Sequence, residues 1–111
     1  MPEFLPYIRA VYEYLLYRLN SERGSIVSIR SIDVLEYAGM RDRPVDRMIM
    51  RYILSQLARA YGGEVIVRND TYIYRLSVPT LRRIINRGFN AFASLIRAID
   101  EAQAKPGLSQ S

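Results

Sequence analysis

Residues 41–77, which read RDRPVDRMIMRYILSQLARAYGGEVIVRNDTYIYRLS, carry the clearest structural signals in the chain. Asp42 or Arg43 can cap a helix whose first turn contains Pro44, a residue favoured at that position. Apolar residues then recur with helical spacing as far as Tyr61, where a pair of glycines ends the pattern. The first half of this stretch therefore predicts one long helix.

The second half of the stretch predicts a β-hairpin. Residues 64–68 and 71–77 are both rich in β-branched and aromatic side chains, which favour strands. Only Asn69 and Asp70 separate them, and both residue types tolerate the positive φ of a tight two-residue turn.

The flanking segments complete the order of elements. Residues 5–19 have helical spacing, 25–30 alternate as in a short strand, and a short helix from Ser31 ends at Gly39. After the hairpin, one helix is expected over residues 80–104. The order is helix, strand, helix, turn, helix, hairpin, helix, so the predicted fold class is α+β, mainly α with a small antiparallel sheet.

This order resembles the winged helix-turn-helix family of DNA-binding proteins, in which three helices, a small sheet and a hairpin wing follow one another. The resemblance implies a winged-helix domain over residues 1–78, whose third helix, from Pro44, enters the DNA major groove. It also implies a C-terminal dimerisation helix over residues 79–104, as in small archaeal winged-helix regulators and chromatin-associated proteins. Residues 105–111 are expected to form a disordered tail.

The composition excludes several kinds of chemistry. The 111 residues contain neither cysteine nor histidine, which removes disulfides, thiol nucleophiles, zinc fingers and Ser/His catalytic pairs. No phosphate-binding or dinucleotide-binding glycine motif occurs. We therefore expect no enzyme activity, no metal and no cofactor. Without a long apolar segment or a signal-peptide pattern, we expect a cytoplasmic protein that has no membrane partner.

The net charge of +5 is unevenly distributed. Residues 41–87 carry ten arginines against four acidic residues, whereas the segments on either side are close to neutral. Arginine offers a planar fork of donors that suits phosphates and guanine edges. The local excess indicates double-stranded DNA as a partner.

Helical spacing divides the predicted helix from Pro44 into two faces. An apolar face is expected at Val45, Ile49, Tyr52, Ile53, Leu57 and Ala60, with Ala58 on the opposite, arginine-bearing side. The predicted DNA-binding residues lie before the helix, on that side of it, or at the hairpin tip: Arg41, Arg43, Arg47, Arg51, Ser55, Arg68, Asn69 and Thr71. The alternative is a solvated face on which Asp42 and Asp46 pair with the arginines.

Apolar residues in the predicted C-terminal helix alternate four and three apart, the spacing of a heptad seam. The predicted dimer interface consists of Leu81, Ile85, Gly88, Phe92, Leu95, Ile99 and Ala102. The alternative is a core helix packed within one chain.

Together these patterns predict a homodimeric DNA-binding protein that regulates transcription or shapes DNA. A small-molecule effector is left open. The alternative function is a winged-helix protein interaction module within a larger assembly, since domains of this family also bind proteins.

Overall fold

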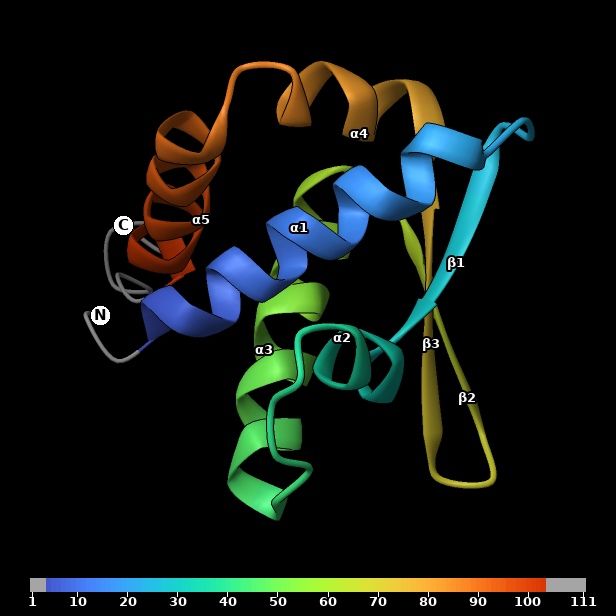
Figure 1. Cartoon of the computed structure of the whole chain (residues 1–111), viewed down its shortest axis with the longest axis vertical. Helices are drawn as coiled ribbons and strands as arrows, with labels where there is room; N and C mark the ends of the chain where they lie inside the picture. The colour runs from blue at the N-terminus through green and yellow to red at the C-terminus, as the bar shows by residue number, and fades with distance from the viewer. Residues whose placement is uncertain (1–3, 104–111) are drawn as a thin grey trace, which may run out of the picture.

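The computed structural model describes residues 4–103, which form five helices and three strands in a mixed α+β fold (Figure 1). In chain order the elements are α1 (Leu5–Ser21), β1 (Ile26–Arg30), α2 (Ser31–Tyr37), α3 (Pro44–Ala60), β2 (Glu64–Arg68), β3 (Thr71–Ser77), α4 (Val78–Ile85) and α5 (Phe89–Gln103). The predicted α+β class and the order of elements as far as the hairpin are confirmed. The predicted tail at residues 105–111 lies outside the described residues.

The three strands form an antiparallel sheet in the order β1-β3-β2. The hairpin between β2 and β3 has the predicted bounds, and Asn69 and Asp70 have φ values of 49° and 64°. Positive φ at both central residues is the geometry that matches the twist of a two-residue hairpin. The local turn chemistry thus fixes the register in which Arg68 lies opposite Thr71.

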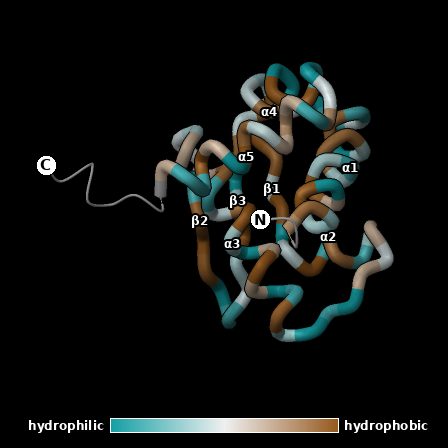
Figure 2. The backbone as a smooth tube through the Cα atoms, turned by 90° about the vertical axis from the view of Figure 1, so that its left-hand side faces the viewer, coloured by the Kyte–Doolittle hydropathy of each residue, from teal (hydrophilic) through white to brown (hydrophobic). Residues whose placement is uncertain are grey.

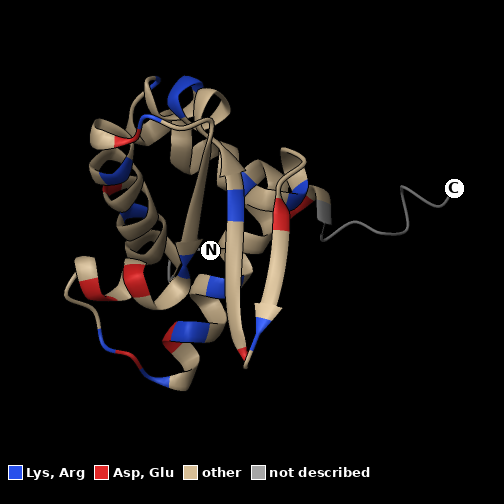
Figure 3. Cartoon of the chain, turned by 90° about the vertical axis from the view of Figure 1, so that its right-hand side faces the viewer, with Lys and Arg blue, Asp and Glu red and all other residues tan. Residues whose placement is uncertain are grey.

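The helices cover one face of the sheet and leave the other face open, as Figures 1 and 3 show from two sides. Alternate side chains of β1 and β3 point into the core between sheet and helices, where Val27, Ile29, Tyr74 and Leu76 are buried. Strand β2 lies at an edge and contributes no buried residue to this core.

The predicted faces of α3 are partly wrong. Val45 and Tyr52, expected in the core, are 43% and 40% exposed, and Ala60 is exposed as well. Ala58, expected on the outer side, is fully buried, together with Met50 and Leu54. The buried side of α3 differs from the predicted side because the helix packs against both the sheet and α5. Tyr52, on the partly exposed side, donates a hydrogen bond to Asp100 of α5.

The expectation of one continuous C-terminal helix is wrong. The chain leaves the helical path after Ile85 and starts α5 at Phe89, with Gly88 at φ 95° between the two helices. A left-handed backbone costs glycine little, and it interrupts a right-handed helix. The break turns α5 back onto α1 and α3.

Several residues of the predicted dimer interface are therefore core residues of this chain. Leu81, Ile85 and Phe92 are buried within it, and Leu95 is half-buried. Ile99 is also half-buried, whereas Ala102 is exposed and Gly88 lies in the break. The seven residues do not form the single seam that a continuous helix would give, and the alternative of intramolecular packing fits most of them.

Candidate nucleic-acid interface

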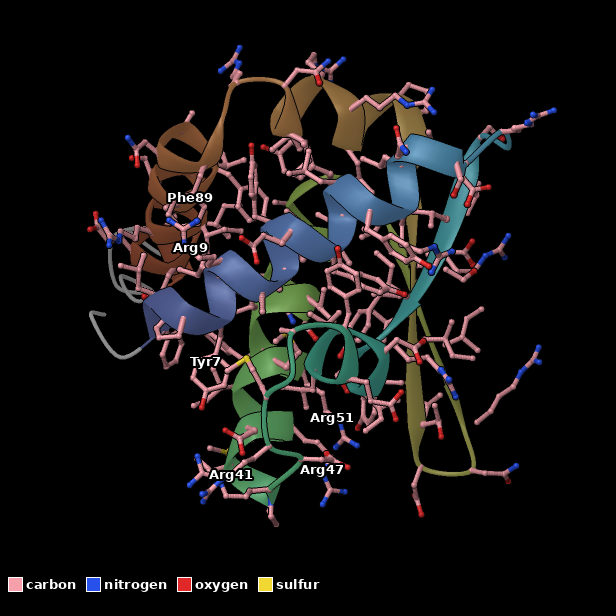
Figure 4. The ribbon with its side chains drawn as sticks, in the orientation of Figure 1. Tyr7, Arg9, Arg41, Arg47, Arg51 and Phe89 are labelled. Carbon is pink, nitrogen blue, oxygen red and sulfur yellow. The ribbon has the colours of Figure 1, made fainter. Side chains whose placement is uncertain are left out.

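The N-terminal end of α3 and the tip of the β2–β3 hairpin reach the same end of the molecule (Figure 1). Arg41, Arg47 and Arg51 lie at this end, around the start of α3 and toward the hairpin (Figure 4). The structure thus brings together the two groups of predicted DNA-binding residues, which are about twenty positions apart in the sequence.

Asp46 fixes the start of α3. Its buried carboxylate accepts hydrogen bonds from the Arg43 backbone N–H at 3.1 Å, from Arg43 Nε at 2.7 Å and from the Tyr7 hydroxyl at 2.6 Å. The Arg43 guanidinium and the Tyr7 hydroxyl hold the pKa of Asp46 far below its usual value, because both bind the charged form. Arg43 therefore serves to anchor the helix as well as to carry charge.

Arg47 makes a looser ion pair. Its Nε lies 3.0 Å from Oδ1 of Asp42, and the two side chains are 42% and 46% exposed. Exposed pairs of this kind contribute at most about 1 kcal/mol, so the guanidinium can exchange Asp42 for another anion at little cost. The pair is the one that the alternative interpretation of this face predicts, in which Asp42 pairs with an arginine of the helix.

Arg51 connects α3 to the hairpin. Its guanidinium lies over the ring of Tyr72, 4.7 Å from the centroid, and donates a long hydrogen bond of 3.5 Å to the carbonyl oxygen of Asp70. Nearby, the Ser55 hydroxyl donates to the Tyr74 hydroxyl at 3.2 Å, and Tyr74 in turn donates to the Arg51 carbonyl at 3.3 Å. These bonds hold the hairpin at a fixed position beside the helix.

A hollow of about 220 Å³ lies between the start of α2, the N-terminal half of α3 and the tip of the hairpin. Three arginines, three hydroxyl-bearing residues, two aspartates and one isoleucine line it: Arg30, Arg47, Arg51, Ser31, Thr71, Tyr72, Asp42, Asp70 and Ile32. The sequence interpretation missed Arg30 and Ser31, because only the sheet order places the end of β1 beside β3. Arg30 is held by Asp33 through two hydrogen bonds of 2.8 and 3.0 Å.

Arg41 and Arg68 differ from the other arginines of this end. Both are exposed, and within residues 4–103 neither makes a hydrogen bond, ion pair or ring contact. Asn69 and Thr71 flank Arg68 at the hairpin tip. Acidic residues are interspersed among the arginines here (Figure 3). The positive potential of this end therefore depends most on the two unpaired side chains.

The outward face of α3 also carries apolar side chains. Met48 is 62% exposed and lies beside the exposed Val45 and Tyr52 on successive turns. Three partly exposed apolar or aromatic side chains therefore lie on one side of α3.

Within residues 4–103 no group of carboxylates is arranged to hold a metal ion. No helix in the same part of the chain combines the length and apolarity that crossing a bilayer requires. In comparison with known proteins, the chain matches no family model, no curated protein and no solved structure.

Proposed function

We propose that this protein binds double-stranded DNA through the N-terminal half of α3 and the β2–β3 hairpin, in the manner of winged-helix proteins. The observation that carries the proposal is that Arg41 and Arg47, at the start of α3, lie at the same end of the molecule as the hairpin tip, where Arg68 borders the turn. The order of helices, strands and hairpin, which resembles that family, supports it. The biological role would be transcription regulation or DNA organisation in the cytoplasm.

The contacts suggest different tasks for the arginines. Arg41 and Arg68 have no partner among the described residues, so they can bind phosphates without breaking a bond within the chain. Arg47 can release the exposed Asp42 and turn to a phosphate or a base edge. Arg43 and Arg51 mainly hold α3 and the hairpin in position.

The test is fluorescence anisotropy with a random-sequence duplex over a series of salt concentrations. We expect the binding constant of the unmodified protein to fall steeply with salt. The double variant Arg41→Ala/Arg68→Ala should bind more weakly, with a salt slope smaller by about 0.9 for each phosphate that the protein no longer neutralises. Neither substitution removes an interaction within the described chain, so stability should be unchanged.

The matched control is Arg83→Ala/Arg87→Ala. It removes the same charge from exposed positions of α4 and the α4–α5 link, at the other end of the molecule (Figure 1). If the control reduces affinity as much as the test variant does, binding depends only on net charge and the proposed interface is wrong. If the unmodified protein does not bind the duplex even at low salt, the DNA proposal itself is wrong.

The second candidate function is protein binding by the same end of the molecule. The exposed Met48, Val45 and Tyr52 on the outward face of α3 favour it, because apolar and aromatic side chains are enriched at protein interfaces. Affinity for duplex DNA that is weak and unaffected by Arg41→Ala/Arg68→Ala would favour this function.

A further inference from the structure

Strand β2 is an edge strand with an unusually apolar and open surface. It pairs with β3 on one side only. Val65 and Val67 are 45% and 56% exposed, and Ile66 on the opposite face is half-buried. Figure 2 shows this apolar strand at the margin of the molecule. Natural edge strands are usually protected by central charges, prolines or bulges, and the charges of β2 stand only at its ends.

The backbone of β2 is also available for pairing. In a two-residue hairpin the residues that flank the turn, here Arg68 and Thr71, form a hydrogen-bonded pair. Because this pattern alternates along an antiparallel ladder, the N–H and C=O groups of Val65 and Val67 point away from β3. They form the free edge of the sheet.

The sequence of the strand, Glu64-Val65-Ile66-Val67-Arg68, is complementary to itself when read in the opposite direction. We propose that two copies of this chain associate through β2, antiparallel and centred on Ile66, to form one continuous six-stranded sheet. In this register Glu64 lies opposite the partner's Arg68, and Val65 lies opposite the partner's Val67. The interface is isologous, as a two-fold dimer requires.

The free backbone groups and the charges select the same register. Only the odd-numbered residues of β2 have N–H and C=O groups that point away from β3. Val65 and Val67 can therefore form hydrogen bonds with the partner strand only where each faces an odd-numbered residue of the partner. A shift by two residues in either direction places Arg68 or Glu64 opposite an isoleucine and leaves its charge unpaired. The centred register alone pairs both valines and both charges, and opposite charges across a strand pair are stabilising.

This dimer has a geometric consequence for DNA binding, which rests on the proposed function. The two-fold axis of an antiparallel strand pair stands perpendicular to the sheet, so the two hairpin tips point in opposite directions. The two ends that carry Arg41 and Arg47 would then face two different duplexes, while Arg68 pairs with the partner's Glu64 at the interface.

The test is sedimentation velocity of the full chain without DNA, over a series of protein concentrations. The unmodified protein should shift toward twice the mass of one chain as its concentration rises. Glu64→Arg and Arg68→Glu should each weaken the dimer by about tenfold or more, because each places like charges directly opposite one another. An equimolar mixture of the two variants should form a heterodimer, since every opposed pair is again of opposite sign.

The controls separate the interface from stability and from general charge effects. Glu13→Arg reverses an exposed charge on α1 and should leave association unchanged. The double variant Glu64→Arg/Arg68→Glu restores the pairing within one chain type and should dimerise. Thermal unfolding should show that the single variants fold, because the Glu64–Arg75 pair that Glu64→Arg breaks is exposed and 3.6 Å long.

Three outcomes would overturn the proposal. The unmodified chain could stay monomeric at every concentration, the single variants could dimerise as well as the parent, or their mixture could fail to recover the dimer. A dimer that is insensitive to both reversals would place the interface elsewhere, and the C-terminal helices α4 and α5 would be the next surfaces to test.

Discussion

The hydroxyl of Tyr7 on α1 donates a 2.6 Å hydrogen bond to Oδ1 of Asp46 in the first turn of α3. The same carboxylate accepts the backbone N–H of Arg43, so one buried group caps α3 and ties it to α1. The end of α3 that carries the proposed DNA-binding residues is therefore held rigidly against the rest of the fold.

Tyr7→Phe should destabilise the protein by about 1.5 to 2 kcal/mol, at the lower end for a hydrogen bond to a charged group, because Asp46 keeps its Arg43 partner. Urea denaturation monitored by circular dichroism measures the difference. Tyr17→Phe is the matched control, since this exposed hydroxyl makes no hydrogen bond to any described residue, and it should be neutral. Equal destabilisation in the two variants would contradict the role given to Tyr7.

Stability should fall in acid because of Asp46. Its pKa in the folded protein lies well below the value of about 3.9 in an unfolded chain, since Arg43 and Tyr7 bind the ionised form. The unfolded state therefore takes up a proton first, and the stability that Asp46 contributes is complete above about pH 4 and declines as the pH falls toward its folded pKa. Asp46→Asn lacks this contribution at every pH.

Denaturation of the parent and Asp46→Asn at a series of pH values checks this expectation. The gap in unfolding free energy between the two proteins should be largest near neutral pH and should shrink below about pH 4. A gap that stays constant down to about pH 2 would mean that the Asp46 carboxylate is not specifically stabilised in its ionised form.

The hairpin can be predicted residue by residue, because its signal is local. Asn69 and Asp70 define the turn, and the strands on either side follow from composition alone. The start of α3 is equally clear, since Pro44 can stand only in a first turn of such a helix. These elements depend on interactions between residues that are close in sequence.

The faces of α3 cannot be predicted with the same success. Val45 and Met50 are both apolar, and helical spacing alone does not decide which of the two side chains is buried. That depends on which neighbouring elements cover the helix. The hydrogen bond of Tyr52 to Asp100 joins residues forty-eight positions apart, and no local pattern indicates it. The candidate site differs from the predicted row of free arginines, because Arg43 and Arg47 form ion pairs with aspartates of the same segment.

The C-terminal segment shows a second limit. The spacing of Leu81, Ile85 and Phe92 fits a dimer seam as well as it fits an intramolecular core, because both need one apolar stripe. The heptad pattern favours Gly88 as a site of close helix approach, whereas its φ of 95° ends the helix. A glycine inside a helical pattern is compatible with a continuous helix and with a break between two helices. The packing of α5 on α1 favours the break.

Gly88→Ala should destabilise the protein by about 1 to 2 kcal/mol, because an alanine at φ 95° is strained even though a Cβ there has open space around it. The measurement is the unfolding free energy from urea denaturation. Gly24→Ala serves as control, since that glycine lies in a loop without positive φ, and it should be neutral or slightly stabilising. A stabilising effect of Gly88→Ala would indicate that α4 and α5 join into one helix.

Asp70→Asn should raise the affinity for duplex DNA. The substitution removes a negative charge from the hairpin tip beside Arg68, and asparagine tolerates the φ of 64° that this position requires. Anisotropy at low salt should show tighter binding with unchanged stability. The control Glu101→Gln removes one negative charge from an exposed position of α5 and should leave affinity close to that of the parent. Weaker binding by Asp70→Asn would contradict the expectation that the negative charge of Asp70 opposes DNA binding.

The β2-mediated dimer, together with the proposed DNA-binding ends, predicts that the protein bridges two duplexes. One duplex is immobilised on beads, a second carries a fluorophore, and the protein should retain the labelled duplex on the beads. Glu64→Arg should abolish this retention while it binds a single duplex at least as well as the parent, because Glu64 lies outside the DNA-binding end. Glu13→Arg adds the same charge on α1 and should retain bridging. Bridging that survives Glu64→Arg would separate the two proposals, because DNA binding would stand and the β2 interface would not account for the second duplex.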